Sequence, residues 1–398
     1  MKRSSLVGGV IITATILFTM NKAMSADHYQ TFVVPDDVME KYFSLPIEKQ
    51  QKSCKARNFV FDKLPVLAQD PPQRIKGYNS RMDNPGLTEG AKETDKYTLR
   101  MSEALTGIIS SNVESQKEIV LESLYQWAKA KALSKTKNCI RSDGSWGCDG
   151  WWSDKKGQNK YAGHDFNTAQ LSIMHLAYGY YFSLASFNPQ DPRHEVIKDW
   201  FNMFFKRNKK AEQMYAGHDS SYHWPEFMES IVNGKEPSVR KIKRLIEFQN
   251  DQINDDGSIQ KRTTRGNKSL WYHYATLNEI VVNMEIARRY GVDIPKGMDE
   301  KIVKSANIFF DGFNDFSYMD KWAKEAYSGV YEPGVQHFNL DIRRVPNGTV
   351  WMYVMQYRYP NTDIANRIAK FVDDKELNNQ AADGITGVGY GCIYKAIL

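Results

Sequence analysis

Apolar residues recur at intervals of three and four along most of this chain, which is the spacing of a buried helix face. Such patterns follow one another from about Lys96 onward, whereas the alternating pattern of strands is sparse. The first two patterns run from Leu105 to Val113 and from Ile119 to Leu133. Further helices are predicted at about 166–187, 194–208, 221–233, 237–252, 270–290, 298–310, 348–358 and 362–373. We therefore expect an all-α protein.

The segment 27–95 lacks this periodicity and contains several prolines. We expect it to wrap irregularly around the helical part, which would extend from 96 to 398. No linker rich in proline, glycine or serine divides that part, so the sequence favours one large helical domain.

Residues 1–26 have the pattern of a secretory signal peptide, with two basic residues, an apolar run from Leu6 to Met20, and small residues near 23–26. The run is too short for a confident membrane span, so we expect a periplasmic or secreted protein without a stable membrane anchor. Cleavage would remove Lys2, Arg3 and Lys22 and no acidic residue, which lowers the formal charge from +6 to +3. This mild charge gives no reason to expect nucleic acid as a partner.

Four cysteines remain in the exported chain, and an even number in an oxidising compartment favours two disulfides. Cys139 with Cys148 would close a tight loop, and Cys54 with Cys392 would tie the two ends together. The sequence alone permits three pairings. The spacing does not match the paired ligands of a zinc site.

One short motif occurs twice: Tyr161-Ala-Gly-His164-Asp165 recurs as Tyr215-Ala-Gly-His218-Asp219. His273 follows at a similar interval, the two spacings being 54 and 55 residues. That length suits a pair of helices with their loops, so the histidines would sit at equivalent ends of successive hairpins, with the two aspartates as N-caps. If the hairpins curl into a toroid, these ends meet on one rim.

The most unusual helix start is Arg265-Gly-Asn-Lys268-Ser-Leu-Trp-Tyr272-His273-Tyr274, where basic, amide, imidazole and phenol groups arrive within ten residues. The helix that follows this start is otherwise apolar. We therefore expect these polar groups to line a cleft and not a solvated face. They are the groups that β-elimination of a uronic-acid polysaccharide requires. A cation or amide neutralises the carboxylate, a base removes the C5 proton, and an acid protonates the departing O4.

Aromatic rings near these motifs offer flat faces for sugar rings. The candidates for substrate contact are His164, Asn167, Trp151, Tyr222, Trp224, Trp271 and His273. His175, within an apolar helix pattern, is instead expected to be a core histidine.

Several segments resemble the alginate lyase family of periplasmic mannuronate-type lyases, and the similarity extends from about Tyr78 to Ile294. The similar segments are Trp127-Ala-Lys-Ala-Lys-Ala-Leu133, Asp165-Phe-Asn167, Asp199-Trp-Phe201, Asp256-Gly257, Leu270-Trp-Tyr-His273 and Tyr290-Gly-Val-Asp293-Ile294. The resemblance implies an (α/α) toroid, an incomplete barrel of helical hairpins, and a polysaccharide lyase. We expect no cofactor and no metal, because Lys or Arg can neutralise the substrate carboxylate.

The chain departs from the family pattern where chemistry is expected. The family's arginine corresponds to Lys268, and its catalytic tyrosine falls on Ala275, immediately after Tyr274. A slip of one residue would restore Tyr274, and Tyr272 is the alternative. The family's Asn-Asn-His-Ser-Tyr-Trp is similar to 219–224, where Ser220 and Ser221 replace the asparagine and the basic histidine.

The leading hypothesis is an exported lyase that acts on an acidic, uronic-acid-containing polysaccharide. Its carboxylate would be neutralised by Lys268 or Arg265 with Asn267, and a second substrate carboxylate would be held by Arg81. The base would be His223 or His218, and the acid Tyr274 or Tyr272, with His273 orienting its neighbours.

Two rival hypotheses stay open. A glycoside hydrolase would use two carboxylates, drawn from Asp219, Glu226, Asp255, Asp256 and Asp341. A non-catalytic protein of a polysaccharide export assembly would bind the polymer without changing it.

Overall fold

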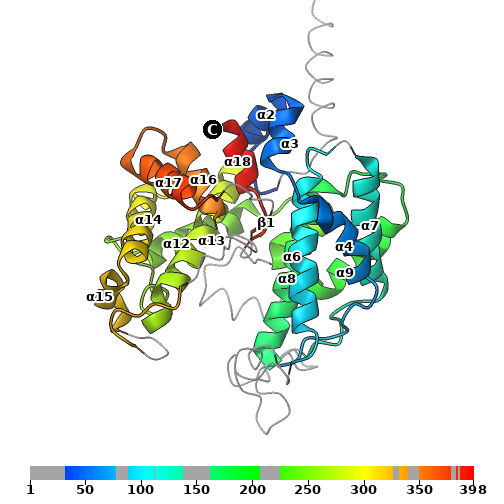
Figure 1. The fold of residues 1–398 in the computed structure, drawn as a ribbon, viewed down its shortest axis with the longest axis horizontal. Helices are drawn as coiled ribbons and strands as arrows, with labels where there is room; N and C mark the ends of the chain where they lie inside the picture. Colours follow the sequence, from blue (N-terminus) through cyan, green and yellow to red (C-terminus); the bar gives the residue numbers. More distant parts are fainter. Residues whose placement is uncertain are drawn as a thin grey trace, which may run out of the picture.

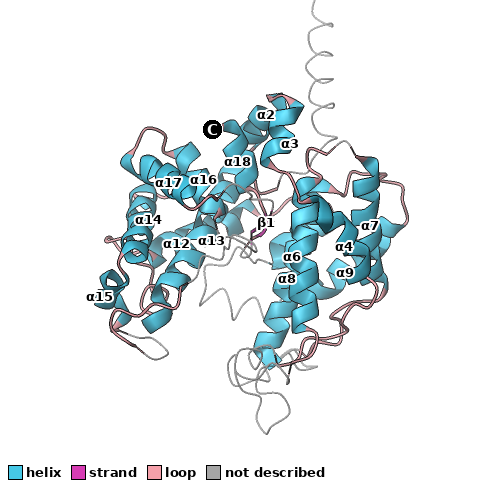
Figure 2. Ribbon diagram, in the orientation of Figure 1, coloured by secondary structure: helices cyan, strands magenta, loops and turns pink. Residues whose placement is uncertain are grey.

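In the computed structural model the described residues are 32–77, 88–111, 113–137, 162–206, 225–325, 331–338, 349–377, 382–383 and 386–398. Nearly all the regular structure in these ranges is helical, as Figure 2 shows. The prediction of an all-α protein is therefore confirmed. No helix in these ranges is long and apolar enough to cross a membrane.

The first group of helices lies N-terminal in the chain. It consists of α4 (Asn58–Leu67), α6 (Ala91–Gly107), α7 (Glu114–Lys129), α8 (Ala162–Ser183), α9 (Arg193–Lys206) and α11 (Pro225–Val232). Helix α6 contacts α4 and α8, α7 contacts α4 and α9, and α11 contacts α8 and α9. Neighbouring helices thus pack side by side through one continuous apolar core.

The second group follows and is built around one long helix, α13. It consists of α12 (Val239–Gln252), the 3₁₀-helix η2 (Gly266–Lys268), α13 (Ser269–Arg289), α14 (Met298–Asn314), the 3₁₀-helix η3 (Phe316–Met319), α15 (Asp320–Ala323), α16 (Val350–Arg358) and α17 (Asp363–Asp374). Helix α13 contacts α12, α14 and α16, which leaves only part of its circumference uncovered by its own group.

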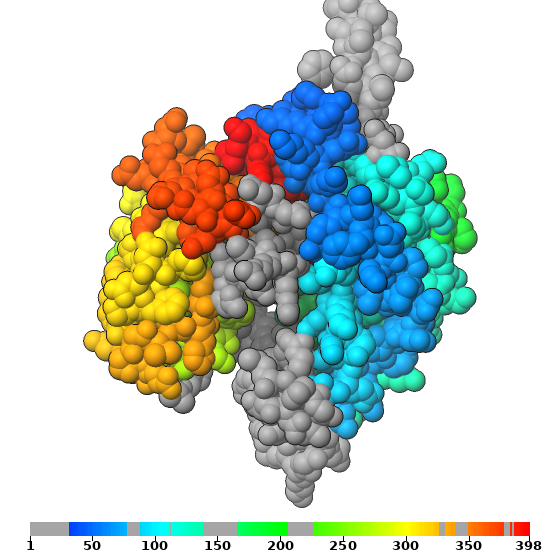
Figure 3. Space-filling model, viewed as in Figure 1, coloured from blue at the N-terminus to red at the C-terminus, as the bar shows by residue number. Residues whose placement is uncertain are grey.

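Elements from both ends of the chain join the two groups, as Figure 1 shows. They are α2 (Asp36–Ser44), α3 (Ile47–Ser53), β1 (Ala382–Asp383), β2 (Gly387–Val388) and α18 (Gly391–Ile397). The two short strands pair antiparallel, with Ala382 opposite Val388. Helix α18 contacts α2, α3 and α16, and β2 contacts α6 and α8. These elements lie at the top of Figure 3, between the described residues of the two groups.

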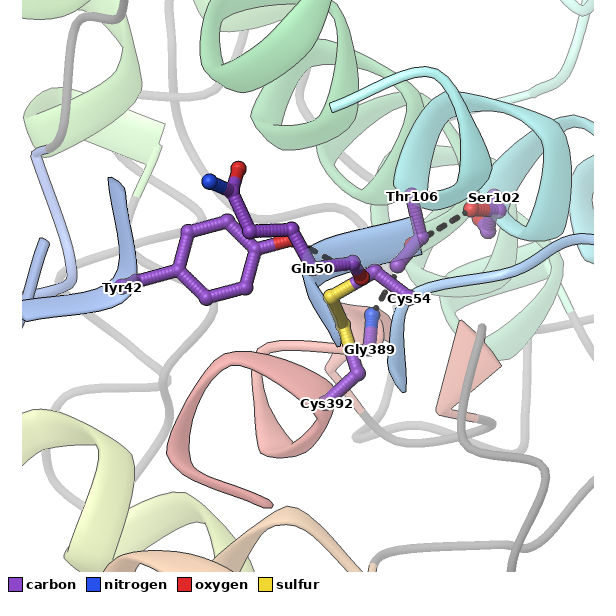
Figure 4. The surroundings of a disulfide bond; sticks show 7 residues. All are labelled: Tyr42, Gln50, Cys54, Ser102, Thr106, Gly389 and Cys392. Carbon is purple, nitrogen blue, oxygen red and sulfur yellow. Dashed lines mark hydrogen bonds between the residues drawn. A yellow bond between two sulfur atoms is a disulfide. The ribbon is translucent and has the colours of Figure 1, made fainter. Parts of the chain in front are cut away.

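A disulfide between Cys54 and Cys392 fastens this junction (Figure 4). The two cysteines are 338 residues apart in the sequence and are both fully buried. Beside the disulfide, the Gly389 amide donates a hydrogen bond of 3.1 Å to the Thr106 hydroxyl of α6. The predicted pairing of these two cysteines is confirmed, whereas Cys139 and Cys148 lie outside the described residues.

The C-terminal half of α13 is tied to the junction by a buried carboxylate, Glu285. This carboxylate accepts hydrogen bonds from Arg288 at 2.6 Å, from Arg358 of α16 at 2.6 and 3.0 Å, and from the Tyr394 hydroxyl of α18. Charge-assisted bonds of this kind hold a helix in one rotational setting. They therefore fix the orientation of α13 about its own axis.

A second buried network connects α13 to the start of α16. The Asp383 carboxylate accepts hydrogen bonds from the backbone amides of Thr349 at 2.9 Å and Val350 at 3.4 Å, and the Asn278 side chain accepts one from the Trp351 amide at 2.9 Å. These side chains satisfy amides at a helix N-terminus that no intrahelical carbonyl can reach.

The helices predicted from 166 onward agree with α8, α9, α11 to α14, α16 and α17 to within a few residues. The segment 27–95, predicted to be irregular, instead contains α2, α3 and α4. These helices span ten residues or fewer, too short for a clear apolar period, and prolines precede two of them, at Pro35 and Pro46. Because proline is well tolerated at a helix start, the prolines mark helix starts here.

The predicted N-cap role of Asp165 is also corrected. Helix α8 begins three residues earlier, at Ala162, so Asp165 lies inside the first turn. Its buried carboxylate accepts a hydrogen bond of 2.8 Å from the Gly77 amide and so ties the N-terminal segment to α8.

Candidate active site

The N-terminal end of α13 is held by residues 336–337, which lie much later in the chain. The buried side chain of Gln336 accepts a hydrogen bond from the Leu270 amide at 3.0 Å and donates one to the Gly266 carbonyl at 3.2 Å. The His337 amide also donates to the Asn267 carbonyl at 2.6 Å. Gly266 has φ +61°, a conformation that a residue with a Cβ adopts only at a cost. The polar start of this helix is therefore rigidly held.

A basic and aromatic surface covers this end of the helix. The Tyr272 ring is flanked by two guanidinium groups, with Arg265 at 4.3 Å and Arg262 at 5.6 Å from the ring centroid. Trp271, 37% exposed, meets Tyr272 edge to face at 4.9 Å, and Lys268 is exposed beside them. Cations, a flat ring and the positive end of a helix dipole together favour binding of an anionic sugar.

This surface lies at the end of α13 that is far from the junction of the two groups. The opposite end carries Tyr290, which contacts Phe227 of α11 at 6.0 Å, and Arg289, which pairs with Asp36 of α2 at 2.9 Å. A helix of 21 residues is about 30 Å long at 1.5 Å per residue. Among the described residues, the basic aromatic surface therefore lies far from the elements that join the two groups of helices.

His273 is fully buried and bonded on both ring nitrogens. Its Nε2 donates to the Ser305 carbonyl of α14 at 2.8 Å, and its Nδ1 accepts from the Thr263 hydroxyl at 2.8 Å. Burial lowers the pKa of His273 to about 4, so the ring is neutral at pH 7. This geometry suits the predicted orienting role, since the ring fastens α13 to α14, and it leaves no ring atom exposed for substrate contact.

Acid is expected to destabilise the protein through His273. The pKa of 6.5 in the unfolded chain and about 4 in the folded protein mean that only the unfolded chain takes up this proton between those values. The contribution of neutral His273 to the free energy of unfolding is therefore fully present above pH 6.5. It is lost as pH falls toward 4, by up to about 3 kcal/mol. Denaturant unfolding from pH 7 to 4.5 measures it. A His273→Asn variant should show a weaker pH dependence, and an identical slope in both proteins would contradict the assignment.

Tyr274 lies inside the core, 1% exposed, against Phe309, Phe338 and Trp351. Its hydroxyl is buried without a hydrogen-bond partner. Burial, with a further contribution from Asp383, raises the pKa of Tyr274 well above its ordinary value. A hydroxyl enclosed in this way cannot reach a polysaccharide, so the geometry favours the alternative, Tyr272, as the acid.

The structure therefore brings together five of the predicted residues: Arg265, Asn267, Lys268, Trp271 and Tyr272. It turns His273 and Tyr274 into the core. The predicted residues Arg81, Trp151, His218, Tyr222, His223 and Trp224 lie outside the described residues, as do the side chains of His164 and Asn167. His175, expected in the core, is half-buried on α8.

The sequence analysis did not single out one charged residue of α13, Glu279. Glu279 lies two helical turns after Tyr272 on the same face, and burial raises its pKa to about 8, although the charge of Arg262 acts to lower it. The apolar residues around it suggested an ordinary core helix. The signal that could have found it is its spacing of 11 from Lys268 and seven from Tyr272, which places all three on one face. Among the described residues, no group of histidine, cysteine and acidic side chains could hold a metal ion.

Comparisons with known proteins agree with this architecture. The sequence profile of the alginate lyase family, described as "Alginate lyase", matches residues 109–316, just over half of the chain. None of the curated proteins compared with the chain matches its sequence.

Solved structures with a similar fold include alginate lyase A1-III from Sphingomonas species A1, with 14% identity, a TM-score of 0.55, and coverage of 92% of this chain and 97% of that one. A histidine-to-alanine variant complexed with a tetrasaccharide has 17% identity, a TM-score of 0.54, and coverage of 90% and 94%. A tyrosine-to-phenylalanine variant, also with a tetrasaccharide, has 15% identity, a TM-score of 0.57, and coverage of 89% and 93%.

The likeness to these structures shows the fold, and the predicted incomplete barrel of helical hairpins is confirmed. A helical toroid with this family profile defines a polysaccharide lyase. The chain belongs to the alginate lyase family.

Proposed function

We propose that this protein is an exported lyase that cleaves an alginate-like or polymannuronate-like polysaccharide by β-elimination. The observation that carries the proposal is the surface at the start of α13, where Arg262 and Arg265 flank Tyr272 beside the exposed Lys268. A polymer with one carboxylate per sugar would find cations, an exposed tryptophan and a phenol there. The family membership and the tetrasaccharide complexes of similar lyases support the substrate class.

In this mechanism Lys268 or Arg265, with Asn267, neutralises the carboxylate attached to C5. Neutralisation makes the C5 proton acidic enough for removal, because charge that develops on the carboxylate is stabilised. The base is His218 or His223, and Arg81 holds a second carboxylate of the polymer. As the C5–H bond breaks, a C4–C5 double bond forms and the C4–O4 bond breaks.

Tyr272 protonates the departing O4 in this mechanism. The assignment rests on its half-buried ring at the basic surface, in contrast to the enclosed ring of Tyr274. One product then carries a new hydroxyl end and the other an unsaturated sugar, so that atoms and charge balance.

Export is supported by two features. The N-terminal pattern is that of a signal peptide, and a disulfide that joins Cys54 to Cys392 suits an oxidising compartment. The mature protein would meet its polymer in the periplasm or outside the cell.

Incubation with polymannuronate, polyguluronate and a neutral polysaccharide tests the function. We expect ultraviolet absorbance of the unsaturated product to rise with a uronate polymer and not with the neutral one. Reducing ends that appear without absorbance would indicate hydrolysis instead. Binding of an intact polymer whose size does not change would indicate a protein without lyase activity toward it.

The described carboxylates that a hydrolase could use are held in local contacts. Glu226 pairs with Lys241, Asp255 with Lys301 at 3.7 Å, and Asp256 accepts hydrogen bonds from Ser258 at 2.6 and 2.9 Å. No observation on these residues favours hydrolysis over elimination.

A further inference from the structure

A second group of aromatic and basic side chains lies on the short elements that follow α14. Tyr318 of η3 is 36% exposed and Lys321 of α15 is also exposed, whereas Trp322 beside them is buried. The Lys321 ammonium lies 3.8 Å from the centroid of the Trp322 ring and 4.7 Å from that of the Tyr318 ring. The two rings meet edge to face at 5.7 Å. These three residues, the Lys321 cluster, therefore hold one ammonium against two aromatic rings.

The Lys321 cluster is anchored to the loop 255–258. The Trp322 indole donates a hydrogen bond of 3.3 Å to Asp256, whose carboxylate also accepts hydrogen bonds from Ser258 at 2.6 and 2.9 Å. Gly257 in this loop lies so close to α14 that a Cβ there would be 2.6 Å from its backbone. A free lysine side chain samples many rotamers, so contacts with two anchored rings reduce the entropy that Lys321 loses when it binds a ligand.

The positive charge of the Lys321 cluster is available to a ligand. Lys321 forms no salt bridge with any acidic residue in the described part of the chain. Its charge acts on Asp256, but both oxygens of that carboxylate already accept hydrogen bonds. The Asp320 carboxylate accepts a hydrogen bond of 2.8 Å from the Gly334 amide. An exposed ammonium beside the exposed Tyr318 ring is a combination that suits a sugar with a carboxylate.

The Lys321 cluster lies close to the basic aromatic surface at the start of α13. Helix α15 contacts η2 directly, and Figure 1 shows α15 at the end of the second group that is far from α18. The segment 334–337 bonds to both sites, through the Gly334 amide to Asp320 and through the His337 amide to the Asn267 carbonyl at 2.6 Å. Three residues of chain span at most about 11 Å. Val335 and His337 between these contacts are exposed, so one polymer chain can touch both sites.

We propose that Tyr318 and Lys321 form a further binding subsite, which holds a uronate sugar of the same polymer away from the sugar that undergoes elimination. This inference rests on the proposed function for the chemistry of the polymer. The Lys321 ammonium pairs with the sugar carboxylate, and the Tyr318 ring covers an apolar face of the sugar. Because neither group touches the reacting bonds, the subsite strengthens binding of a long polymer equally in the ground state and the transition state.

Kinetics on long polymannuronate and on the shortest mannuronate oligomer that the wild-type protein cleaves test this subsite. Lys321→Gln removes the charge, Tyr318→Ala removes the ring, and Lys321→Arg keeps a cation. On the long polymer we expect Lys321→Gln and Tyr318→Ala each to raise KM about fivefold with kcat unchanged, and Lys321→Arg to stay near wild type. On the short oligomer KM should stay within about twofold of wild type in all three variants.

A matched control removes the same charge elsewhere. Lys243 of α12 is an exposed lysine that pairs with Glu247 of the same helix at 3.9 Å. Lys243→Gln should leave KM on the long polymer within about twofold of wild type. Added salt should raise the KM of the wild-type protein more steeply than that of Lys321→Gln, because salt screens the pairing that this variant lacks. Thermal unfolding of each variant checks that it is folded.

An unchanged KM on the long polymer in folded Lys321→Gln and Tyr318→Ala, or an equal rise in Lys243→Gln, would overturn the inference and leave the proposed function standing. An equal rise in KM on the long and short substrates would also overturn it. Absence of elimination by the wild-type protein on every uronate polymer would instead overturn the proposed function. Titration calorimetry with intact polymannuronate then decides the subsite separately. Weaker binding by Lys321→Gln than by the wild-type protein would support it, and equal binding or none by the two proteins would remove it.

Discussion

Replacement of Tyr272 by phenylalanine is expected to lower kcat for β-elimination about a thousandfold, within the range that loss of a general acid usually costs. The ring would remain between Arg262 and Arg265, since their contacts are to its face, so binding of the polymer should change little. The loss should therefore appear in kcat and only weakly in KM. Initial rates from the absorbance of the unsaturated product measure both constants.

The neighbouring tyrosine supplies a matched control with the same chemical change. Tyr274→Phe removes a hydroxyl that is buried without a hydrogen-bond partner. Burial of such a group costs about 1–3 kcal/mol, so this variant should keep its activity and unfold at an equal or higher denaturant concentration. If Tyr274→Phe abolished elimination while Tyr272→Phe did not, the assignment of the acid would be refuted.

Removal of the disulfide is expected to cause the largest loss of stability. Simultaneous Cys54→Ala and Cys392→Ala substitutions should lower the free energy of unfolding by about 5 kcal/mol, because the bond closes a loop across a sequence separation of 338 residues. A disulfide that closes a longer loop removes more conformational entropy from the unfolded chain, so its loss stabilises the unfolded chain more. Alanine is preferred to serine because both positions are fully buried and a hydroxyl there would need a partner.

Denaturant unfolding of the wild-type and double-variant proteins, each with and without a reductant, measures the effect. The reductant should destabilise the wild-type protein by a similar amount. Any effect of the reductant on the double variant reports on a bond between Cys139 and Cys148. The double variant is therefore the control for this second predicted disulfide. Equal stability of the oxidised wild-type and double-variant proteins would show that the junction does not depend on this bond.

The helical fold was largely predictable because its signal is local. The period of apolar residues in α13 and α14 can be read within the length of each helix, and it does not depend on which helices pack against them. The same is not true of α2 and α3, which are too short to show a period and form because α18, from the other end of the chain, packs against them. The prolines at their starts are a local signal for these helices that an analysis of apolar periodicity alone does not use.

The sequence by itself determined that α13 exists, that polar and aromatic groups gather at its first turn, and that Cys54 and Cys392 are candidates to join the two ends. Only the tertiary structure decided which of those groups can meet a substrate. Tyr272, His273 and Tyr274 are consecutive, so each is turned by about 100° from the one before, and neighbouring elements settle which side is covered. Ser305 and Phe309 of α14 enclose His273 and Tyr274 from more than 30 residues away, and the phenol of Tyr272 remains on the uncovered side.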